Sequence, residues 1–315
     1  MDKIIILQDS DELICDIKAA NSSPIETLGF NQINHSKGVK TLHEGTMIDS
    51  YTPEDIATIT NELIDERVSE ILNNFDNQDY QIFHCLSVKN TFRKKVDLNY
   101  KKKENKKFNP FMNPDIRQHL IDKFQIYDKN NNPDGKILVG SDVEADDKIG
   151  IAATYFHKKI KAQGDNPIIV ISSQDKDFKT IPNVWIYNHK TQEMTYNTYL
   201  DAIKFWLTQI MMGDRQDGVI GLKGYGHVSA VKFVDENIMS GVKSTYLKIK
   251  AIYKDKGRET DCLKNAILLR ILTNDFYNTE TQEPILFSEE HLDFLDNEFY
   301  SNVRIPRLPT KPIHR

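Results

Sequence analysis

The chain has 315 residues, of which 39% are hydrophobic and 28% charged, and its formal net charge is −5. This composition is that of an ordinary soluble protein with one large domain or two smaller ones. No apolar run is long enough to span a bilayer, and acidic residues near the N-terminus exclude a secretory signal peptide. Three scattered cysteines lack metal-ligand spacing and fit a reducing compartment, so we expect a cytoplasmic protein (in the host cytoplasm, if viral) without membrane partners.

Positive charge is concentrated in one segment. Residues 89–107 contain nine basic and two acidic residues, a net charge of +7, so the rest of the chain carries −12. A basic segment on an acidic body is an electrostatic dipole of the kind that contacts phosphates. A solvated, mobile run of charge is the alternative interpretation.

The first part of the chain alternates strand and helix patterns. Residues 3–9 predict a buried strand that ends in an acid, and Thr52-Pro53 begins a helix whose apolar residues recur at helical spacing to Phe75. A further helix is predicted over residues 143–160. Four more strands are predicted, over residues 79–88, 136–142, 166–175 and 184–188. The alternation predicts the α/β class, with a mostly parallel central sheet flanked by helices.

From residue 198 onward the patterns are helical. Helical periodicity covers residues 199–212, 227–238 and 261–274. The predicted organisation is an α/β core over residues 1–197, which includes the basic segment at about 88–125, followed by a helical region over residues 198–315. That region ends in a basic, proline-containing tail.

Acidic residues follow the ends of three predicted strands. These residues are Asp9 after the first strand, Glu144, Asp146 and Asp147 after the third, and Asp175 and Asp177 after the fourth. The carboxyl ends of parallel strands open on one crevice, so the three groups are expected to converge. Each group also has a purely structural interpretation: Asp142 as a helix N-cap, a pair between Glu144 and Lys148, or an ordinary turn at residues 173–178.

Six carboxylates in one crevice repel one another and raise each other's pKa unless a cation is present. Ligand sets made only of oxygen favour hard cations, Mg²⁺ or Mn²⁺, over zinc. A cluster of this size is sufficient for two ions, and two ions ~4 Å apart can hold a phosphodiester and promote its in-line hydrolysis. The acidic pattern therefore predicts a phosphodiester hydrolase with two Mg²⁺ or Mn²⁺ ions.

Three motifs, EADD at residues 144–147, DKDF at 175–178 and MGDRQDGVIGLKGYG at 212–226, resemble in this order those of the bacteriophage 5′-nucleases. These enzymes are 5′→3′ exonucleases and flap endonucleases related to the 5′-nuclease domain of bacterial DNA polymerase I. The resemblance extends from about residue 4 to residue 233. It implies a PIN-like core, a helical arch inserted at the basic segment, and a helix–three-turn–helix module at about residues 205–240.

The resemblance also implies roles for individual residues. Lys101, Asp146 and Asp175 fall on catalytic positions, and Lys101 on the arch lysine that contacts the scissile phosphate. The implied ligands of two Mg²⁺ (or Mn²⁺) ions are Asp9, Glu144, Asp146, Asp147, Asp175, Asp177, Asp214 and Asp217. The residues expected to bind DNA are Arg93, Lys94, Tyr100, Lys101, Lys102, Lys103 and Lys106 in the basic segment, and Gly221, Lys223, Gly224 and Gly226 in the glycine hairpin, where K⁺ is a further candidate ligand.

The second strand departs from the family pattern. The family places an acid near the end of this strand, whereas this sequence has none between Gln81 and Arg93. Ser87 or Cys85 stands in its place, and His84 is either a substitute ligand or a structural strand histidine.

Two further departures affect the first strand and the basic segment. The first strand is followed by both Asp9 and Asp11, of which Asp9 is preferred as the ligand. No arginine follows the Tyr100-Lys101 pair; Lys103 or Lys106 would serve there, without the bidentate fork of arginine.

The implied function is a metal-dependent 5′→3′ exonuclease or structure-specific flap endonuclease that acts near the 5′ ends of DNA or RNA primers. Its expected partners are double-stranded DNA with 5′ ends or flaps, RNA–DNA hybrids and replication proteins. Two alternatives stay open: a non-catalytic, structure-specific DNA-binding protein with a degraded metal site, and a PIN-like ribonuclease. Retention of the other acids argues against the former, and the basic insertion and glycine hairpin favour DNA over RNA.

Overall fold

The computed structural model describes residues 4–22, 53–76, 79–88, 91–102, 114–124, 137–138 and 142–302. Several predicted features lie outside these residues: the N-cap at Thr52, the DNA-binding residues Lys103 and Lys106, and the basic C-terminal tail. None of the described helices is long and apolar enough to cross a membrane.

A six-stranded sheet with the order β3-β2-β1-β4-β5-β6 forms the centre of the first half of the chain. The strands are β1 (Ile4–Asp9), β2 (Tyr80–Cys85), β3 (Ile137–Leu138), β4 (Ile168–Ser172), β5 (Val184–Asn188) and β6 (Glu193–Asn197). Neighbouring strands are parallel except β5 and β6, which are antiparallel. The sheet confirms the predicted α/β class. The edge strand β6 was not predicted, because its polar residues carry little strand signal.

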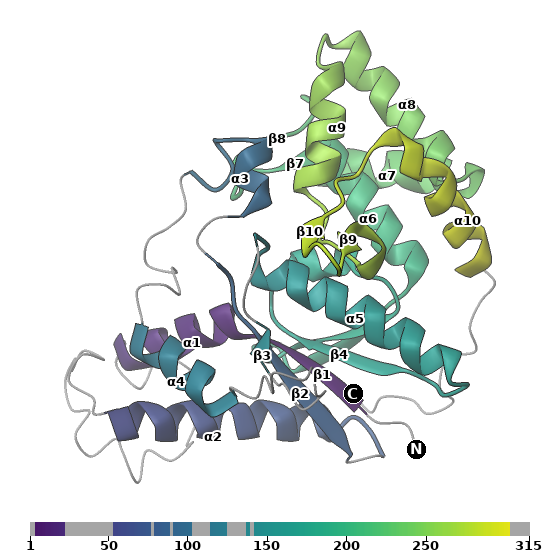
Figure 1. Ribbon diagram of the computed structural model, residues 1–315. Coiled ribbons are helices and arrows are strands. Elements are labelled where there is room, and N and C mark those ends of the chain that lie inside the picture. The colour runs from purple at the N-terminus through teal and green to yellow at the C-terminus, as the bar shows by residue number, and fades with distance from the viewer. Residues whose placement is uncertain are drawn as a thin grey trace.

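Helices cover both faces of the sheet (Figure 1). One face carries α1 (Ser10–Ser22), α2 (Pro53–Leu72) and α4 (Pro114–Phe124), and the other carries α5 (Ala145–Ala162). Strand β1 shows why both faces are needed: Ile4 and Ile6 pack in the core under α2, whereas Ile5 and Leu7 pack in the core under α5. Alternate residues of a strand point to opposite faces, so an apolar run such as β1 requires cover on both sides.

The predicted basic segment contains two described helices, α3 (Phe92–Val96) and α4. A turn at residues 98–102 follows α3 and lies against the helical half of the chain. Residues 103–113 of the predicted arch lie outside the described residues.

The second half of the chain is helical, as predicted. Its helices are α6 (Tyr199–Met212), α7 (His227–Asn237), α8 (Val242–Asp255), α9 (Glu259–Leu268) and α10 (Leu292–Asn302). Two-residue strands pair as β7 (Gly213–Asp214) with β8 (Val219–Ile220), and as β9 (Tyr277–Asn278) with β10 (Glu283–Pro284). Short 3-10 helices are η6 (Lys176–Thr180), η7 (Ile238–Ser240), η8 (Asn274–Phe276) and η9 (Glu289–His291).

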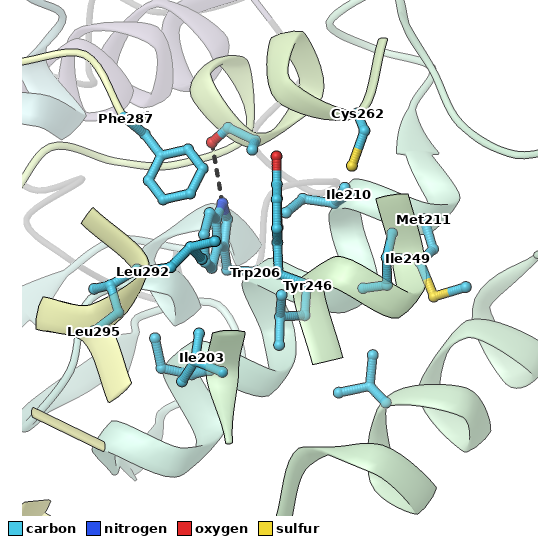
Figure 2. Close-up of a cluster of buried hydrophobic side chains, with 14 of the residues drawn as sticks. Ile203, Trp206, Ile210, Met211, Tyr246, Ile249, Cys262, Phe287, Leu292 and Leu295 are labelled. Carbon is cyan, nitrogen blue, oxygen red and sulfur yellow. Dashed lines mark hydrogen bonds between the residues drawn. The ribbon is translucent and has the colours of Figure 1, made fainter. Parts of the chain in front are cut away.

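Trp206 is at the centre of the core of this helical half (Figure 2). Its indole Nε1–H donates to the carbonyl oxygen of Ala266 (3.1 Å), and its ring packs edge-on against Phe287. Phe92 and Val143 from the first half of the chain belong to the same apolar cluster. The two halves are therefore joined by shared apolar packing.

The predicted helix over residues 261–274 is wrong in its second half. Helix α9 ends at Leu268, and residues 269–273 form an irregular segment. The apolar residues of this segment are buried as in a helix, but its backbone groups bind side chains from α3 and α5 instead of each other. Apolar spacing alone does not distinguish these two arrangements.

Candidate metal centre and nucleic-acid interface

The carboxylate of Asp9 lies at the carboxyl end of β1. It accepts hydrogen bonds from the Glu12 amide (3.2 Å) and the Ser173 hydroxyl (3.2 Å), which belong to α1 and to the turn after β4. Ser173 also donates to Glu12 (2.6 Å). Desolvation, followed by the neighbouring charges of Glu12 and Asp11, raises the pKa of Asp9 well above its usual range. A carboxylate in this state is well suited to a cation.

The N-terminus of α5 carries the second group of acids. Glu144 is the N-cap residue, and Asp147 accepts its amide hydrogen (3.3 Å), so the interpretation of Asp142 as the cap is wrong. Asp142 is exposed and pairs with Lys95 instead. Desolvation and the charges of Asp147 and Glu144 raise the pKa of Asp146 well above its usual range. The acids of this motif therefore both begin the helix and create an unfavourable concentration of negative charge.

Arg93 of α3 neutralises part of that charge from within the protein. Its guanidinium makes a bidentate pair with Asp147 (2.5 and 2.7 Å) and contacts Glu144 (3.0 Å). The same guanidinium donates to the carbonyl oxygens of Leu268 (3.2 Å) and Arg270 (2.9 Å). Arg93 is only 1% exposed, and its guanidinium contacts the protein's own acids, so the structure gives no support to the prediction that it binds DNA.

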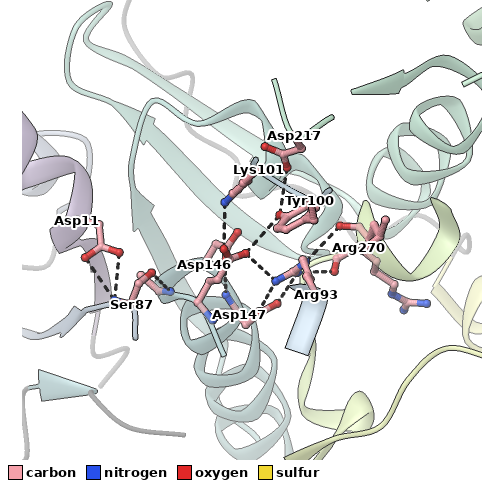
Figure 3. A network of polar contacts seen from close by, with 12 residues as sticks. Asp11, Ser87, Arg93, Tyr100, Lys101, Asp146, Asp147, Asp217 and Arg270 are labelled. Carbon is pink, nitrogen blue, oxygen red and sulfur yellow. Dashed lines mark hydrogen bonds and ion pairs between the residues drawn. The ribbon is translucent and has the colours of Figure 1, made fainter. Parts of the chain in front are cut away.

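Tyr100 and Lys101 connect the N-terminus of α5 to the turn between β7 and β8 (Figure 3). The Tyr100 hydroxyl donates to Asp217 (3.1 Å) and lies 3.3 Å from Glu144, while the Lys101 amide donates to the Asp217 carbonyl oxygen (2.9 Å). Lys101 Nζ is 3.2 Å from Glu144 Oε1. Tyr100 is 4% exposed, so in this arrangement its ring is packed inside the protein, and its predicted role in binding DNA stays a prediction.

The negative charge of Glu144 and the positive charges of Lys101 and Arg93 favour one another's ionised states. Although desolvation opposes ionisation, Lys101 and Arg93 hold the pKa of Glu144 below its usual range. Glu144 in turn holds the pKa of Lys101 well above its usual range, against the effect of desolvation. Lys101 is therefore a cation, and it has a left-handed backbone (φ 50°) that non-glycine residues rarely adopt.

The third and fourth groups of acids lie after β4 and around β7. Asp175 caps η6 by accepting the Asp177 amide hydrogen (2.9 Å), and Gln209 of α6 donates to Asp177 (2.8 Å). Asp214 pairs with Lys176. The structural interpretation of this motif as a capped turn is therefore compatible with its functional interpretation as part of a site.

The acidic groups act on one another across the strand ends. Asp175 contributes to the raised pKa of Asp9, although less than desolvation does, and desolvation with Asp177 and Glu144 raises the pKa of Asp217 against the effect of Lys101. These interactions join residues from β1, α5, η6 and the β7–β8 turn. Acids from separate strand ends therefore lie close enough to shift one another's pKa, and their joint role as a metal site stays a prediction.

The end of β2 carries no acid, and a neighbouring helix supplies one. Asp11, in the first turn of α1, accepts the Ser87 amide hydrogen at 3.1 and 3.3 Å. Arg117 of α4 contacts both Asp11 (3.5 Å) and the Ser87 carbonyl oxygen (2.5 Å). Ser87 itself accepts the amide hydrogen of Ala145 (2.8 Å) at the start of α5.

His84 does not replace the missing acid. Its ring is fully buried within β2, and Nδ1 lies 3.0 Å from the Ser10 hydroxyl. This is the structural strand histidine that the sequence left open.

The glycine hairpin lies between β8 and α7. Gly221 leaves no room for a side chain, because an added Cβ would lie 2.2 Å from the Met212 carbonyl group. Lys223, Gly224 and Gly226 are exposed, and Gly226 precedes the first residue of α7. Gly224 has φ +92°. The hairpin thus presents exposed backbone and one lysine at the N-terminus of a helix, a combination that attracts phosphate.

The remaining described residues of the predicted interface are also at the surface. Lys94 and Lys102 are exposed on α3 and on the turn that precedes the undescribed part of the basic segment.

The donor set fits a hard divalent cation. The ligand atoms at the strand ends are all carboxylate oxygens, and those of Asp147 are already held by Arg93. Several of the other acids have raised pKa values, which a bound cation would lower. A second group, Glu12, Asp16 and His189, also has ligand-type atoms close together. There the Arg67 guanidinium contacts Asp16 (2.6 Å) and already supplies positive charge.

Sequence reasoning missed the roles of Arg93 and of the Glu12–Ser173 contact. Arg93 stands in a run of basic residues with no signal that separates it from its exposed neighbours. Ser173 lies in the same turn as Asp175, and a hydroxyl beside an expected ligand was the one indication available.

Two curated phage proteins are similar to this chain in sequence. The exonuclease of Escherichia phage T7 is 28% identical over 173 residues, which cover 50% of this chain and 55% of that protein. The exodeoxyribonuclease of Enterobacteria phage T3 is 29% identical over 169 residues, which cover 50% of this chain and 54% of that protein. The chain thus spans about half the length of the curated relatives it matches. No family model matches the chain.

Solved structures of bacteriophage T5 proteins share the fold. T5 5′-exonuclease with bound zinc superimposes with a TM-score of 0.54 at 17% identity, covering 85% of this chain and 89% of that chain. The T5 flap endonuclease in a complex with DNA and metal ions gives a TM-score of 0.51 at 16% identity, with the same coverage. A T5 protein co-crystallised with metal ions gives a TM-score of 0.55 and covers 90% of that chain. The chain is therefore similar in sequence to two phage exonucleases over half of its length and has the fold of the phage T5 5′-exonuclease.

Proposed function

We propose that the chain is a metal-dependent 5′-nuclease that hydrolyses phosphodiesters near the 5′ ends of DNA, as an exonuclease or a flap endonuclease. The observation that carries the proposal is that carboxylates at the end of β1, the start of α5, η6 and the β7–β8 turn shift one another's pKa, with Lys101 paired to Glu144 among them. The similarity to phage exonucleases and the shared fold with metal-bound T5 nucleases support the same activity.

The proposed ligands are Asp9, Glu144, Asp146, Asp175, Asp177, Asp214 and Asp217. Two Mg²⁺ or Mn²⁺ ions held there would orient the phosphodiester and lower the pKa of the attacking water. Asp147 has a different role in this proposal: its oxygens are occupied by Arg93 and by the Leu272 amide (3.0 Å), so it anchors the start of α5. The family resemblance alone would have counted Asp147 as a ligand.

Asp11 takes the place of the acid that β2 lacks. Strand β2 lies between β3 and β1 in the sheet, so a carboxylate above its end is central among the other acids. Asp11 is held at this position by the Ser87 amide, and Glu144 and Asp11 are close enough for Glu144 to contribute to the raised pKa of Asp11, behind the larger effect of desolvation.

Lys101 acts electrostatically. In the described arrangement it pairs with Glu144, and cations bound to Glu144 would free the ammonium group to contact the scissile phosphate. The left-handed backbone and the hydrogen bond from the Lys101 amide to the Asp217 carbonyl oxygen hold Lys101 beside the acids.

Exposed backbone at Gly224 and Gly226 and the N-terminus of α7 bind the duplex phosphates away from the cut. Contacts to phosphates carry no base information, so the proposed enzyme selects its substrate by structure. K⁺ at this hairpin, RNA–DNA hybrids as substrates and replication proteins as partners are parts of the same proposal.

Cleavage assays test the proposal directly. End-labelled 5′-flap, nicked duplex, blunt duplex, RNA–DNA hybrid and single-stranded RNA are each incubated with Mg²⁺, Mn²⁺ or EDTA. We expect metal-dependent release of short 5′ products from DNA. Absence of cleavage of every substrate would refute the nuclease activity, and cleavage confined to single-stranded RNA would identify a ribonuclease instead.

Single-turnover rates test the residues. Asp175→Asn should abolish cleavage while duplex binding remains, and Lys101→Ala should slow cleavage about 100-fold or more, the scale of a lost electrostatic contact in a transition state. Lys254→Ala is the control, because Lys254 is an exposed lysine outside the basic segment. Equal rates for the two lysine variants would remove Lys101 from the mechanism.

Cation binding tests Asp11. Asp11→Asn should weaken Mn²⁺ affinity, measured by calorimetry without DNA, about tenfold or more. Arg117→Gln should not weaken it, since this change removes a positive charge from the same carboxylate. If both variants lose affinity equally, Asp11 has only a structural role; Asp11→Asn combined with Ser87→Asp tests whether an acid on β2 restores binding.

A further inference from the structure

A cavity of about 250 Å³ lies beside the C-terminal half of α5, away from the acidic centre. Its walls come from α5, from residues 182–183, from η8 and from α10. Its lining is partly aromatic and apolar, with Phe276, Phe294 and Leu295. The proposed nuclease activity uses none of these residues.

Arg270 lines this cavity; the charge of Asp275 acts on its guanidinium, but the described residues form no ion pair with it. Its Nη1 atom is buried and has no hydrogen-bond partner among the described residues. The guanidinium lies over the rings of Phe276 (4.2 Å) and Trp206 (4.9 Å), which hold it in place without accepting its hydrogen bonds. Desolvation lowers the pKa of Arg270 to about 10, so the group is still a cation at neutral pH.

Other groups of the lining favour an anion of more than one oxygen. Lys158 and Lys161 of α5 add two positive charges at the rim, against Asp275, which pairs with Lys158 (2.5 Å), and Glu298. With Arg270 the lining has three cations and two acids. The side-chain amides of Asn183 and Asn302 add hydrogen-bond donors to the lining. The Asn302 amide also donates to the Glu298 carbonyl oxygen (2.8 Å), and the Ser301 hydroxyl donates to the Asn297 carbonyl oxygen (2.8 Å). A tetrahedral oxyanion accepts more hydrogen bonds than a carboxylate, so it matches this wall better.

The cavity is separate from the acidic centre but shares one backbone segment with it. The Arg270 carbonyl oxygen accepts from Arg93, and the Leu272 amide donates to Asp147. The side chain of Arg270 points the other way, away from the carboxylates (Figure 3). A ligand on Arg270 would therefore contact the segment that holds the buried Arg93–Asp147 pair.

We propose that this cavity is an anion site for a small phosphate-bearing ligand, with the Arg270 guanidinium as its principal contact and Lys161 at its mouth. An unpaired buried guanidinium gains hydrogen bonds from such an anion that the protein itself does not provide.

Binding is measured with the full chain in EDTA, so that divalent ions do not recruit anions to the acidic centre. The probes are inorganic phosphate, a deoxynucleoside 5′-monophosphate and the corresponding nucleoside. Calorimetry and thermal unfolding measure the binding of each probe. We expect saturable binding of the two phosphates and none of the nucleoside. Tighter binding of the nucleotide than of phosphate would show that the apolar wall contacts a base; equal binding would identify phosphate alone as the ligand.

Variants locate the site. Arg270→Gln should lower phosphate affinity about tenfold or more, because a hydrogen bond to a charged group is lost, and Arg270→Lys should be intermediate. Lys161→Glu tests the same site from the exposed rim, where folding is not at risk. Lys254→Gln removes an exposed positive charge elsewhere and should leave affinity unchanged.

Two results would overturn the proposal. One is the absence of saturable phosphate binding by the wild-type chain. The other is unchanged affinity in both Arg270→Gln and Lys161→Glu. Lys101→Ala, which removes the partly exposed cation of the acidic centre, should retain phosphate binding; loss of binding in this variant would place the anion at the acidic centre instead. Neither result depends on whether the chain cleaves DNA.

Discussion

Arg93 lies between the carboxylates of Glu144 and Asp147 and is withdrawn from solvent. A buried ion pair of this kind contributes little net stability compared with apolar packing, but removal of one partner leaves an uncompensated charge inside the protein. Arg93 also binds two carbonyl oxygens of the segment after α9. At the scale of single residues, Arg93 therefore connects the acids at the start of α5 to the segment after α9.

We expect Arg93→Gln to lower the free energy of unfolding by about 3–5 kcal/mol, because Asp147 would stay buried without its cation. Urea denaturation of the metal-free chain measures the change. Lys94→Gln is the matched control: Lys94 is exposed on the same helix, and its loss should change stability by less than about 0.5 kcal/mol. Similar midpoints for the two variants would contradict the structural role of Arg93.

Asp146→Asn should stabilise the metal-free chain and abolish cleavage. The folded protein raises the pKa of Asp146 above its ordinary value of 3.8, so the ionised carboxylate opposes folding. This penalty is fully present above the raised pKa and disappears as the pH falls through it toward 3.8. At neutral pH the variant should gain on the order of 1 kcal/mol.

Thermal unfolding between pH 4 and pH 8 checks the sign of this effect. The difference in melting temperature between Asp146→Asn and wild type should be largest at the upper end of this range and should shrink toward its lower end. A variant that is less stable than wild type at neutral pH would contradict the assignment of Asp146 to an electrostatically strained site.

At the scale of elements, the β7–β8 hairpin connects the acidic centre to the glycine hairpin. Asp214 ends β7 and Asp217 lies in the turn, and the Tyr100–Lys101 turn packs against the hairpin through hydrogen bonds to Asp217. Gly221, immediately after β8, crosses the Met212 carbonyl group at close range. The spacing between the proposed cut and the proposed duplex contact is therefore set by the packing of these short elements.

Gly221→Ala and Gly226→Ala should show which glycine of the hairpin is required for packing and which one is free to contact DNA. A Cβ at position 221 would overlap the Met212 backbone, which should destabilise the chain by about 3 kcal/mol or more. A Cβ at position 226 meets open space, so its effect on stability should not exceed about 1 kcal/mol. Thermal unfolding and duplex binding distinguish the two; equal destabilisation would show that the hairpin is not packed as described.

At the scale of the whole molecule, negative charge gathers at the strand ends while positive charge gathers in residues 89–107. The described part of that segment lies beside the acidic centre through Arg93, Tyr100 and Lys101. Nucleic acid that approaches the basic segment would therefore meet the acids only where cations offset them.

DNA binding should weaken steeply with salt. Each phosphate neutralised adds about −0.9 to the slope of log affinity against log salt concentration on duplex DNA. A variant with Lys102, Lys103, Lys106 and Lys107 changed to Gln should have a slope shallower by up to about 3.6 on a 5′-flap substrate. Fluorescence anisotropy in Ca²⁺ at several salt concentrations measures it, and an unchanged slope would show that the segment is not in contact with DNA.

The sequence by itself determined the α/β class, the strands β1, β2, β4 and β5, the helical second half and the acids at the strand ends. These features depend on local periodicity and on the geometric rule that parallel strands end at one edge of a sheet. Only the tertiary structure decided that Arg93 and Tyr100 are buried, that α9 stops at Leu268, and that Asp11 lies above the end of β2. Each of these depends on contacts between residues roughly 40 to 180 positions apart in the chain, such as the bond from Arg93 to the Arg270 carbonyl oxygen, and local sequence carries no signal for such pairings.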